Sequence, residues 1–142
     1  MKKNKTIDLK FERMLATTPS KAYSAWMNPK IKGTTWNMGE KLILNPKVNG
    51  FFYWLVHGTP HYGRFTKMER GSRVQYTWMS PYTQGTETTV TVTFQKKGPE
   101  TLMTLIHSDL PNNKYGKAHN EGWNDFLTVF PKNFKATARK KK

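Results

Sequence analysis

The stretch HNEGWNDFLTVF, residues 119–130, decides how the rest of the chain must be arranged. Its apolar residues follow the i, i+3, i+4, i+7 spacing that lines one face of an α-helix. They are Trp123, Phe126, Leu127 and Phe130. A helix with one apolar face needs a second apolar surface to cover it. The sequence therefore predicts one long helix within residues 111–134, packed on an element that lies elsewhere in the chain.

A strand and a short helix are predicted at the start of the chain. Apolar and polar residues alternate over TIDLKFERMLAT, residues 6–17, which predicts a strand with one face inward. TTPSKAYSAWMNP, residues 17–29, predicts a helix, because Thr17 or Thr18 can cap it and Pro19 suits its first turn. The glycine-interrupted stretch that follows has room for at most one helical turn.

Six further strands are predicted between this helix and the C-terminal one. They lie near residues 41–45, 50–56, 61–69, 72–80, 90–94 and 101–107. Turn signals separate them, among them Asn49-Gly50 and Gly58-Thr59-Pro60. Consecutive hairpins make a curved antiparallel sheet with one apolar face. We therefore expect an α+β fold in which this sheet wraps around the long C-terminal helix, with short helices after the first strand.

Several motifs carry a resemblance to a known family. They are TPSKAYSAWMNP, NGFFYW, VQYTW, TTVTVTF and the spaced pattern TLMTLIHSDLPN....H.EGW. Together they resemble the SRPBCC (START-like, helix-grip) superfamily, and within it the branch of the activator of heat-shock protein 90 ATPase homologue. The resemblance covers about residues 7–130. It implies a hydrophobic cavity between sheet and helix, but this branch has no shared catalytic residue set to carry over. Asn49-Gly50 stands where the family usually has two glycines.

Length and composition predict one domain. The 142 residues suit a single core, which we place at residues 1–134, followed by a basic tail at 135–142. The chain has no cysteine, so disulfides and thiolate metal sites are excluded. Its apolar runs, such as FFYWLV, are too short to span a bilayer, and the charged start is unlike a signal peptide. We expect a cytoplasmic protein without membrane insertion.

The formal net charge of +15 raises the question of nucleic-acid binding. Nine of the 24 Lys and Arg residues lie in two terminal segments without acids, residues 1–5 and 132–142. The middle of the chain is only mildly basic, and no nucleic-acid-binding motif accompanies the charge. We expect only nonspecific contact with nucleic acids or other polyanions, made through the tails.

The aromatic residues are the candidate ligand-binding residues. Five Trp, six Tyr and eight Phe are many for this length, and several fall at inward positions. Plain core packing explains any one of them, but several Trp and Tyr on one concave face indicate a partly polar cavity. With two histidines, the predicted ligand-binding set is Trp26, Trp54, Tyr76, Trp78, His107, His119, Trp123 and Phe126.

Two of the four histidines, His107 and His119, are expected near the same end of the sheet. His107 should point inward near one end of the sheet, and His119 lies one helical turn before Trp123 and should face the same end. A structural hydrogen-bonding role is the default for His107, with ligand contact as the alternative. Two imidazoles alone do not make a metal site, so neither a metal nor a cofactor is predicted.

A small hydrophobic or aromatic molecule is the partner that the sequence favours. The alternatives are a co-chaperone-like domain that binds a protein partner and a cyclase or hydrolase that uses the same cavity. No catalytic residue is predicted, since no nucleophile elbow, phosphate loop or HExxH motif is present. If the domain were an enzyme, His107 with Tyr76 or Glu121 would be the acid–base candidates.

Overall fold

One seven-stranded antiparallel sheet organises the chain. The computed structural model describes residues 6–37 and 40–134; the predicted basic tail and residues 1–5 lie outside this part. The strands are β1 Thr6–Leu15, β2 Lys41–Leu44, β3 Phe51–Val56, β4 Thr59–Glu69, β5 Arg73–Trp78, β6 Thr88–Lys97 and β7 Glu100–Pro111. Their order across the sheet is β1-β7-β6-β5-β4-β3-β2. The predicted succession of strand, helix, six strands and long helix is confirmed.

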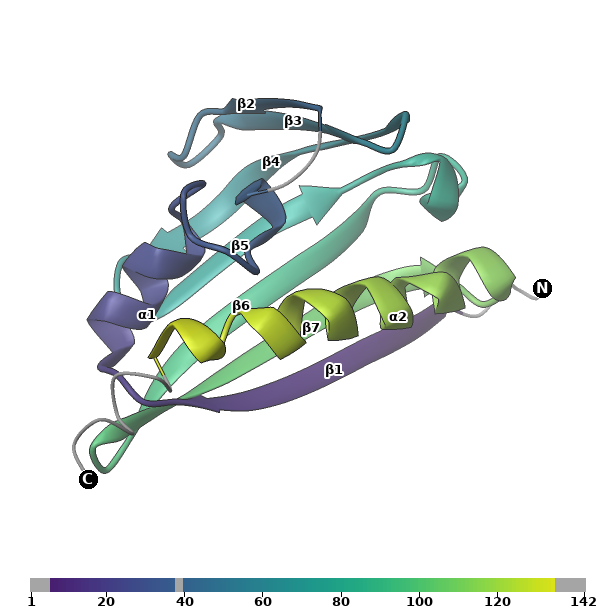
Figure 1. Cartoon of the computed structure of the whole chain (residues 1–142). Coiled ribbons are helices and arrows are strands. Elements are labelled where there is room, and N and C mark those ends of the chain that lie inside the picture. Colours follow the sequence, from purple (N-terminus) through teal and green to yellow (C-terminus); the bar gives the residue numbers. More distant parts are fainter. Residues whose placement is uncertain (1–5, 38–39, 135–142) are drawn as a thin grey trace.

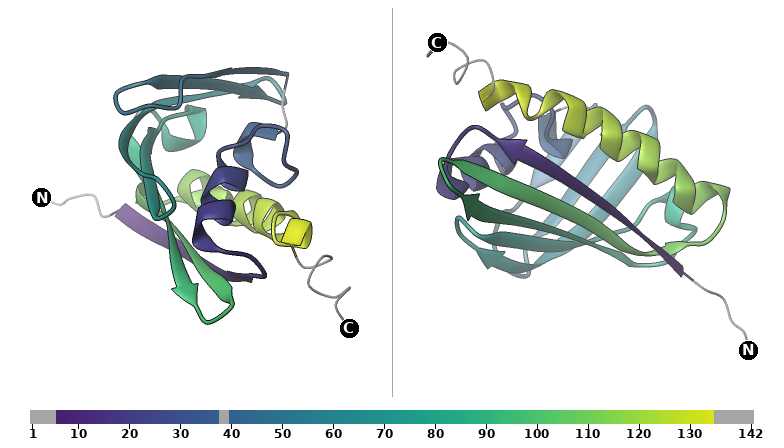
Figure 2. Two further views of the ribbon diagram at one scale, coloured as in Figure 1. Left: turned by 90° about the vertical axis from the view of Figure 1, so that its left-hand side faces the viewer. Right: turned by 90° about the horizontal axis from the view of Figure 1, so that it is seen from below.

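The long helix α2, Lys114–Val129, lies along the concave face of the sheet (Figure 1). In the left view of Figure 2, where the helix is seen nearly end-on, the strands curl around one side of it. The helix begins here because the Asn113 side chain accepts hydrogen bonds from two backbone N–H groups of the first turn, at 3.0 and 3.1 Å. The predicted apolar face is confirmed, since Trp123, Leu127 and Phe130 are buried against the sheet.

The edge strand β1 holds the far side of α2. Arg13 of β1 donates one hydrogen bond to the carbonyl oxygen of Leu127 and another to the Asn124 side chain, each at 3.2 Å. Because the donor is a charged guanidinium group, these bonds are strong, and they hold the end of the helix on the sheet. They leave the opposite side of α2, which faces β3 to β5, for the cavity described below.

The connection from β1 to β2 crosses from one edge of the sheet to the other. It contains α1, Pro19–Trp26, and the single 3₁₀ turn η1, Thr35–Asn37, and it covers one end of the concave face (Figure 1). Thr18 caps α1 by accepting a hydrogen bond from Lys21 N at 3.2 Å, as predicted. Gly33 has a φ of +87° and lies so close to α2 that a Cβ there would be 2.4 Å from the backbone nitrogen of Phe130.

The turn between β3 and β4 differs from the prediction. Gly58-Thr59-Pro60 was expected to form it, whereas the turn residues are His57 and Gly58, with φ of 52° and 74°. Positive φ at both central residues is the type I′ geometry that matches the twist of a two-residue hairpin. Thr59 therefore pairs with Val56, and Pro60 belongs to β4. Glu40 stabilises the turn by accepting hydrogen bonds from the two turn N–H groups, at 2.9 and 3.2 Å.

An aromatic cluster fills the part of the concave face under η1. The ring of Trp36 packs on Phe52, Phe65 and Tyr76, with centroid separations of 5.1, 6.2 and 5.6 Å. All four side chains are buried, so this part of the sheet has a solid core.

None of the described helices is long and apolar enough to cross a bilayer.

Candidate ligand-binding cavity

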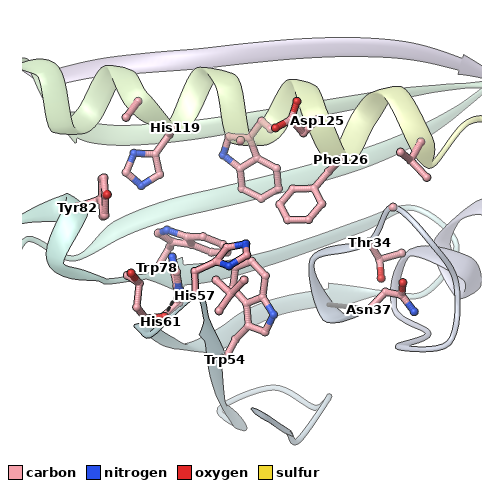
Figure 3. Close-up of a pocket in the computed structure, with 17 residues that line it drawn as sticks. Thr34, Asn37, Trp54, His57, His61, Trp78, Tyr82, His119, Asp125 and Phe126 are labelled. Atoms are coloured by element: carbon pink, nitrogen blue, oxygen red, sulfur yellow. Dashed lines mark hydrogen bonds between the residues drawn. The ribbon is translucent and has the colours of Figure 1, made fainter. Parts of the chain in front are cut away.

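A cavity of about 560 Å³ lies between α2 and strands β3 to β5. Four aromatic side chains that pack on one another form its apolar wall, and Figure 3 labels three of them, Trp54, Trp78 and Phe126. Centroid separations are 5.8 Å for Trp54–Trp78, 5.3 Å for Trp78–Trp123, 5.8 Å for Trp123–Phe126 and 5.9 Å for Phe126–Trp54. Trp123 and Phe126 come from the helix, and the other two come from the sheet. The wall thus joins the two layers of the fold.

Both halves of this wall follow from local structure. Trp54 and Trp78 point inward because they occupy alternate, buried positions of β3 and β5. Trp123 and Phe126 are three residues apart on α2 and so share one face of the helix. The space between the halves stays open because Ala118 and Gly122 provide the helix surface there, and a Cβ at Gly122 would meet nothing within 4 Å.

A chain of hydrogen bonds behind the wall fixes His107 as a neutral side chain. The indole Nε1 of Trp123 donates to Nδ1 of His107 at 3.0 Å, so this nitrogen is an acceptor. The other nitrogen, Nε2, must then carry the proton, and it lies 2.7 Å from the hydroxyl of Thr88. That hydroxyl in turn donates to the carbonyl oxygen of Trp78 at 2.6 Å. Burial lowers the pKa of His107 well below its ordinary value, and the proximity of His119 lowers the pKa further.

His119 differs from His107 because one of its nitrogens faces the cavity. Its Nδ1 lies 3.2 Å from the carbonyl oxygen of Tyr115 and 3.1 Å from that of Gly116, one helical turn back. Its ring meets that of His107 edge-on, with centroids 5.0 Å apart. Figure 3 shows the side chain pointing from α2 into the cavity, toward Trp78. Burial lowers the pKa of His119 below its ordinary value.

His61 completes the polar side of the cavity. Its Nδ1 lies 3.1 Å from the carbonyl oxygen of Thr59, and its ring packs on Trp54 and Trp78 at 4.7 and 5.2 Å. Burial lowers its pKa to about 4. The indole Nε1 of Trp78 is buried and has no hydrogen-bond partner within residues 6–37 and 40–134. A ligand atom or water that reached this N–H would remove an unsatisfied donor, which costs ~1–3 kcal/mol when buried.

Five of the eight predicted ligand-binding residues line the cavity: Trp54, Trp78, His119, Trp123 and Phe126. The other three lie elsewhere in the core. Trp26 of α1 packs on Phe130 beyond the end of the cavity, with centroids 5.1 Å apart, and Tyr76 lies under Trp36. His107 lies behind the wall with both nitrogens engaged, which is the structural role that the sequence favoured. The predicted proximity of His107 and His119 is confirmed.

Sequence reasoning missed His61, His57 and Tyr82, which also line the cavity. A usable signal existed for His61. A two-residue turn at His57-Gly58 places His61 directly opposite Trp54, and hence on the same inward face. The assumed turn at residues 58–60 shifted this register. No sequence signal pointed to Tyr82, which lies in the single turn η2, Pro81–Thr83, beside the start of α2.

The groups considered for acid–base catalysis are not gathered at the cavity. Tyr76 on β5 and His107 on β7 are separated by Val90 of β6, which pairs with both. Glu121 is exposed and does not line the cavity. No group of three or more metal-ligating side chains occurs among the residues that the structure describes.

An antiparallel sheet wrapped around a C-terminal helix, with an open cavity between them, defines a helix-grip protein of the SRPBCC superfamily. Residues 16–135 match the family described as Activator of Hsp90 ATPase homolog 1-like protein. The chain belongs to this family, as the sequence resemblance implied. No curated protein sequence matches it.

Solved structures of low sequence identity share the fold. The Aha1 dimer from Colwellia psychrerythraea superposes with a TM-score of 0.74 at 16% identity, covering 90% of this chain and 96% of that one. An HSP90 activator from Plasmodium falciparum gives 0.69 at 22% identity, with coverage of 93% and 96%. A protein from Chromobacterium violaceum gives 0.72 at 18%, with coverage of 89% and 96%.

Proposed function

We propose that this domain binds a small hydrophobic or aromatic molecule in the cavity between α2 and the sheet. The observation that carries the proposal is a cavity of about 560 Å³ lined by four aromatic side chains that pack on one another, Trp54, Trp78, Trp123 and Phe126. Small-molecule sites are clefts of roughly 300–1,000 Å³ with mostly apolar and aromatic walls and a few polar groups. Large apolar walls that fold around open space lose packing contacts, which a ligand would restore. We place this function in the cytoplasm, a location that fractionation of cells would check.

Gly122 offers a direct test, because it lines the cavity and a Cβ added there would meet no protein atom within 4 Å. We expect an apolar fluorescent dye to bind the native protein with near 1:1 stoichiometry and to quench tryptophan fluorescence. The variant Gly122→Phe should fill the cavity and lose most of this binding. Gly122→Ala is the matched control, since it adds only a methyl group and favours the helix.

The outcomes of these measurements decide whether the cavity binds a ligand. Bound ligand should also raise the melting temperature of the native protein and of Gly122→Ala, with a stabilisation that grows with the logarithm of the ligand concentration above Kd. Native protein that binds no apolar probe, or Gly122→Phe that binds the dye as well as Gly122→Ala does, would contradict ligand binding at this cavity.

A protein partner is the second candidate function, and a separate observation favours it. Three large side chains on the outer face of β2 to β4 are exposed: Phe51 by 68%, Ile43 by 55% and Tyr62 by 45%. Ile43, Tyr53 and Tyr62 lie side by side in register across these strands. Exposed apolar patches of this kind often mark protein-binding sites. The family description and the Plasmodium relative suggest an Hsp90-type chaperone as the partner.

Binding to a purified Hsp90 from the same organism tests this second function. We expect Phe51→Ser to weaken chaperone binding and any stimulation of its ATPase, while dye binding in the cavity remains. Met14→Ser, an exposed apolar residue on the opposite edge strand β1, is the control. Equal affinities of the wild type and Phe51→Ser for the chaperone would exclude this face as the contact.

A further inference from the structure

We propose that the cavity selects uncharged aromatic molecules that carry a hydroxyl group, which donates a hydrogen bond to Nε2 of His119. The inference rests on the proposed ligand-binding function and names the class of ligand. It depends on the protonation of His119, on the charges around the cavity and on which other polar groups are already engaged.

The surroundings of His119 fix which nitrogen carries its proton. Nδ1 lies within 3.2 Å of the carbonyl oxygens of Tyr115 and Gly116, and a carbonyl can only accept a hydrogen bond. Nδ1 is therefore the donor. In the neutral ring Nε2 then carries a lone pair and accepts. Burial favours this neutral form, because it lowers the pKa of the ring.

The acceptor nitrogen of His119 is available to a ligand. No residue of the described chain, 6–37 and 40–134, hydrogen-bonds to it, and the ring lines the cavity opposite Trp78. His107, the neighbouring imidazole, cannot take this role because Trp123 and Thr88 occupy both of its nitrogens. A ligand hydroxyl placed on the aromatic wall would meet His119 Nε2 as a free acceptor.

The charges around the cavity argue against an ionic ligand. Among the described residues that line it, none is Lys or Arg, although the whole chain has a formal charge of +15. An anion would therefore lack a cationic partner inside the cavity. A cation would meet one lining carboxylate, the exposed Asp125, but would be repelled by the field of a strongly basic protein. An uncharged aromatic molecule fits both conditions.

Three matched probes test this selectivity by calorimetric titration at pH 7.5: 2-naphthol, 2-methoxynaphthalene and 2-naphthoate. They share the ring system, but only naphthol donates a hydrogen bond and only naphthoate is an anion. We expect the wild type to bind naphthol about 3- to 10-fold more tightly than the methoxy compound, which is the effect of one hydrogen bond in a binding site. Naphthoate should bind more weakly than naphthol.

Two variants assign the preference to one atom. His119→Phe keeps an aromatic ring but has no acceptor, so the naphthol-to-methoxy affinity ratio should fall to about 1. His119→Gln restores an acceptor oxygen and should recover part of the ratio. Circular dichroism and melting curves check that both variants are folded. The ratio, unlike either affinity alone, is insensitive to a general change in cavity shape.

The possible results distinguish this inference from the proposed function itself. If no probe binds the wild type, ligand binding at the cavity fails. If the probes bind but naphthol has no advantage, or its advantage survives in His119→Phe, ligand binding stands and the role of His119 is overturned. Naphthoate binding more tightly than naphthol would also overturn it, because the cavity would then recognise anions.

Discussion

The indole nitrogen of Trp123 on α2 donates a hydrogen bond to His107 on β7, and the two groups are completely buried between the layers of the fold. This bond makes the helix part of a polar chain that continues through Thr88 to the backbone of β5. Trp123 donates, His107 and Thr88 each accept one bond and donate one, and the Trp78 carbonyl oxygen accepts, so the removal of any link leaves buried polar groups unsatisfied.

Thr88→Val should therefore destabilise the protein. The substitution keeps the side-chain shape but removes the hydroxyl, so the Trp78 carbonyl and His107 Nε2 lose their partner. We expect a loss of ~1–3 kcal/mol in the free energy of unfolding, the cost of unsatisfied buried polar groups. Urea unfolding measures it. Thr89→Val, at the half-buried next position, is the control and should change stability by less than ~0.5 kcal/mol. Equal effects of the two substitutions would show that this series of buried hydrogen bonds contributes nothing to the free energy of unfolding.

Stability should fall as the pH is lowered below about 6.5. His61, His107 and His119 all have a pKa lowered by burial, that of His61 to about 4. The unfolded chain, in which these groups keep their ordinary pKa near 6.5, then takes up protons more readily than the folded one. Their stabilising contribution is full above pH 6.5 and is lost as the pH falls through the folded-state values. Urea unfolding at pH 7, 6, 5 and 4 measures the slope.

The slope can be assigned by substitution. His61→Gln should make the decline between pH 6.5 and 4 shallower, because one buried titrating group is gone. A slope unchanged by His61→Gln would contradict a lowered pKa for this residue.

Trp123→Ala and Phe126→Ala should have contrasting effects on stability and dye binding. Trp123 is buried and hydrogen-bonded, so its truncation should cost ~3–5 kcal/mol, the range for large aromatic residues in a core. Phe126 is half-buried at the cavity wall and should cost less, yet its loss should weaken dye binding more than it lowers stability. Thermal unfolding and dye titration measure both. A full core-sized cost at Phe126 would mean that the cavity is closed in solution.

Gly33→Ala should be far more harmful than Gly58→Ala. Both glycines have positive φ, +87° and +74°, so alanine brings backbone strain of ~1–2 kcal/mol at either position. Only at Gly33 would the new Cβ also collide with backbone atoms of Phe130. The helix end would have to move, which adds roughly 1–3 kcal/mol. Melting temperatures of the two variants check this, and similar losses would contradict the close approach of loop and helix.

Deletion of residues 135–142 should leave the melting temperature nearly unchanged. The segment offers no apolar periodicity to a core, but it contains five Lys and Arg residues. Binding to heparin or single-stranded DNA should become weaker and less sensitive to salt, because fewer counterions are released. A large drop in melting temperature would instead mean that the segment packs on the domain.

The sequence predicted the layers of the fold well because periodicity reports which face of an element is buried. The apolar face of α2 and the inward positions of Trp54 and Trp78 follow from it directly. It could not separate Tyr76 from Trp78, which lie on the same inward face of β5. Tyr76 is in the core and Trp78 lines the cavity because Trp36, from the β1–β2 connection, packs on Tyr76 and fills that part of the concave face. No local pattern shows where such a loop side chain will lie.

The hydrogen-bond chain also lay beyond sequence reasoning, for a related reason. His107 was expected near His119, and it is, but its neutral state depends on Trp123 and Thr88 from two other elements. Such a site is defined by the register of distant strands. A single residue in the β3–β4 turn was enough to conceal His61, since a shift in a turn changes which side chains face each other across a hairpin.

The pairing of the first strand with the last has a consequence for how the chain folds. Strands β2 to β7 pair with their sequence neighbours, so each can join as soon as it is synthesised. β1 has to wait, since Thr6 pairs with Pro111 and Leu15 with Thr101. Until that late closure, the outer edge of β7 exposes unpaired backbone groups that could pair with another newly made chain. The chain is therefore most prone to aggregation after β7 has formed and before β1, the first strand to be synthesised, has paired with it.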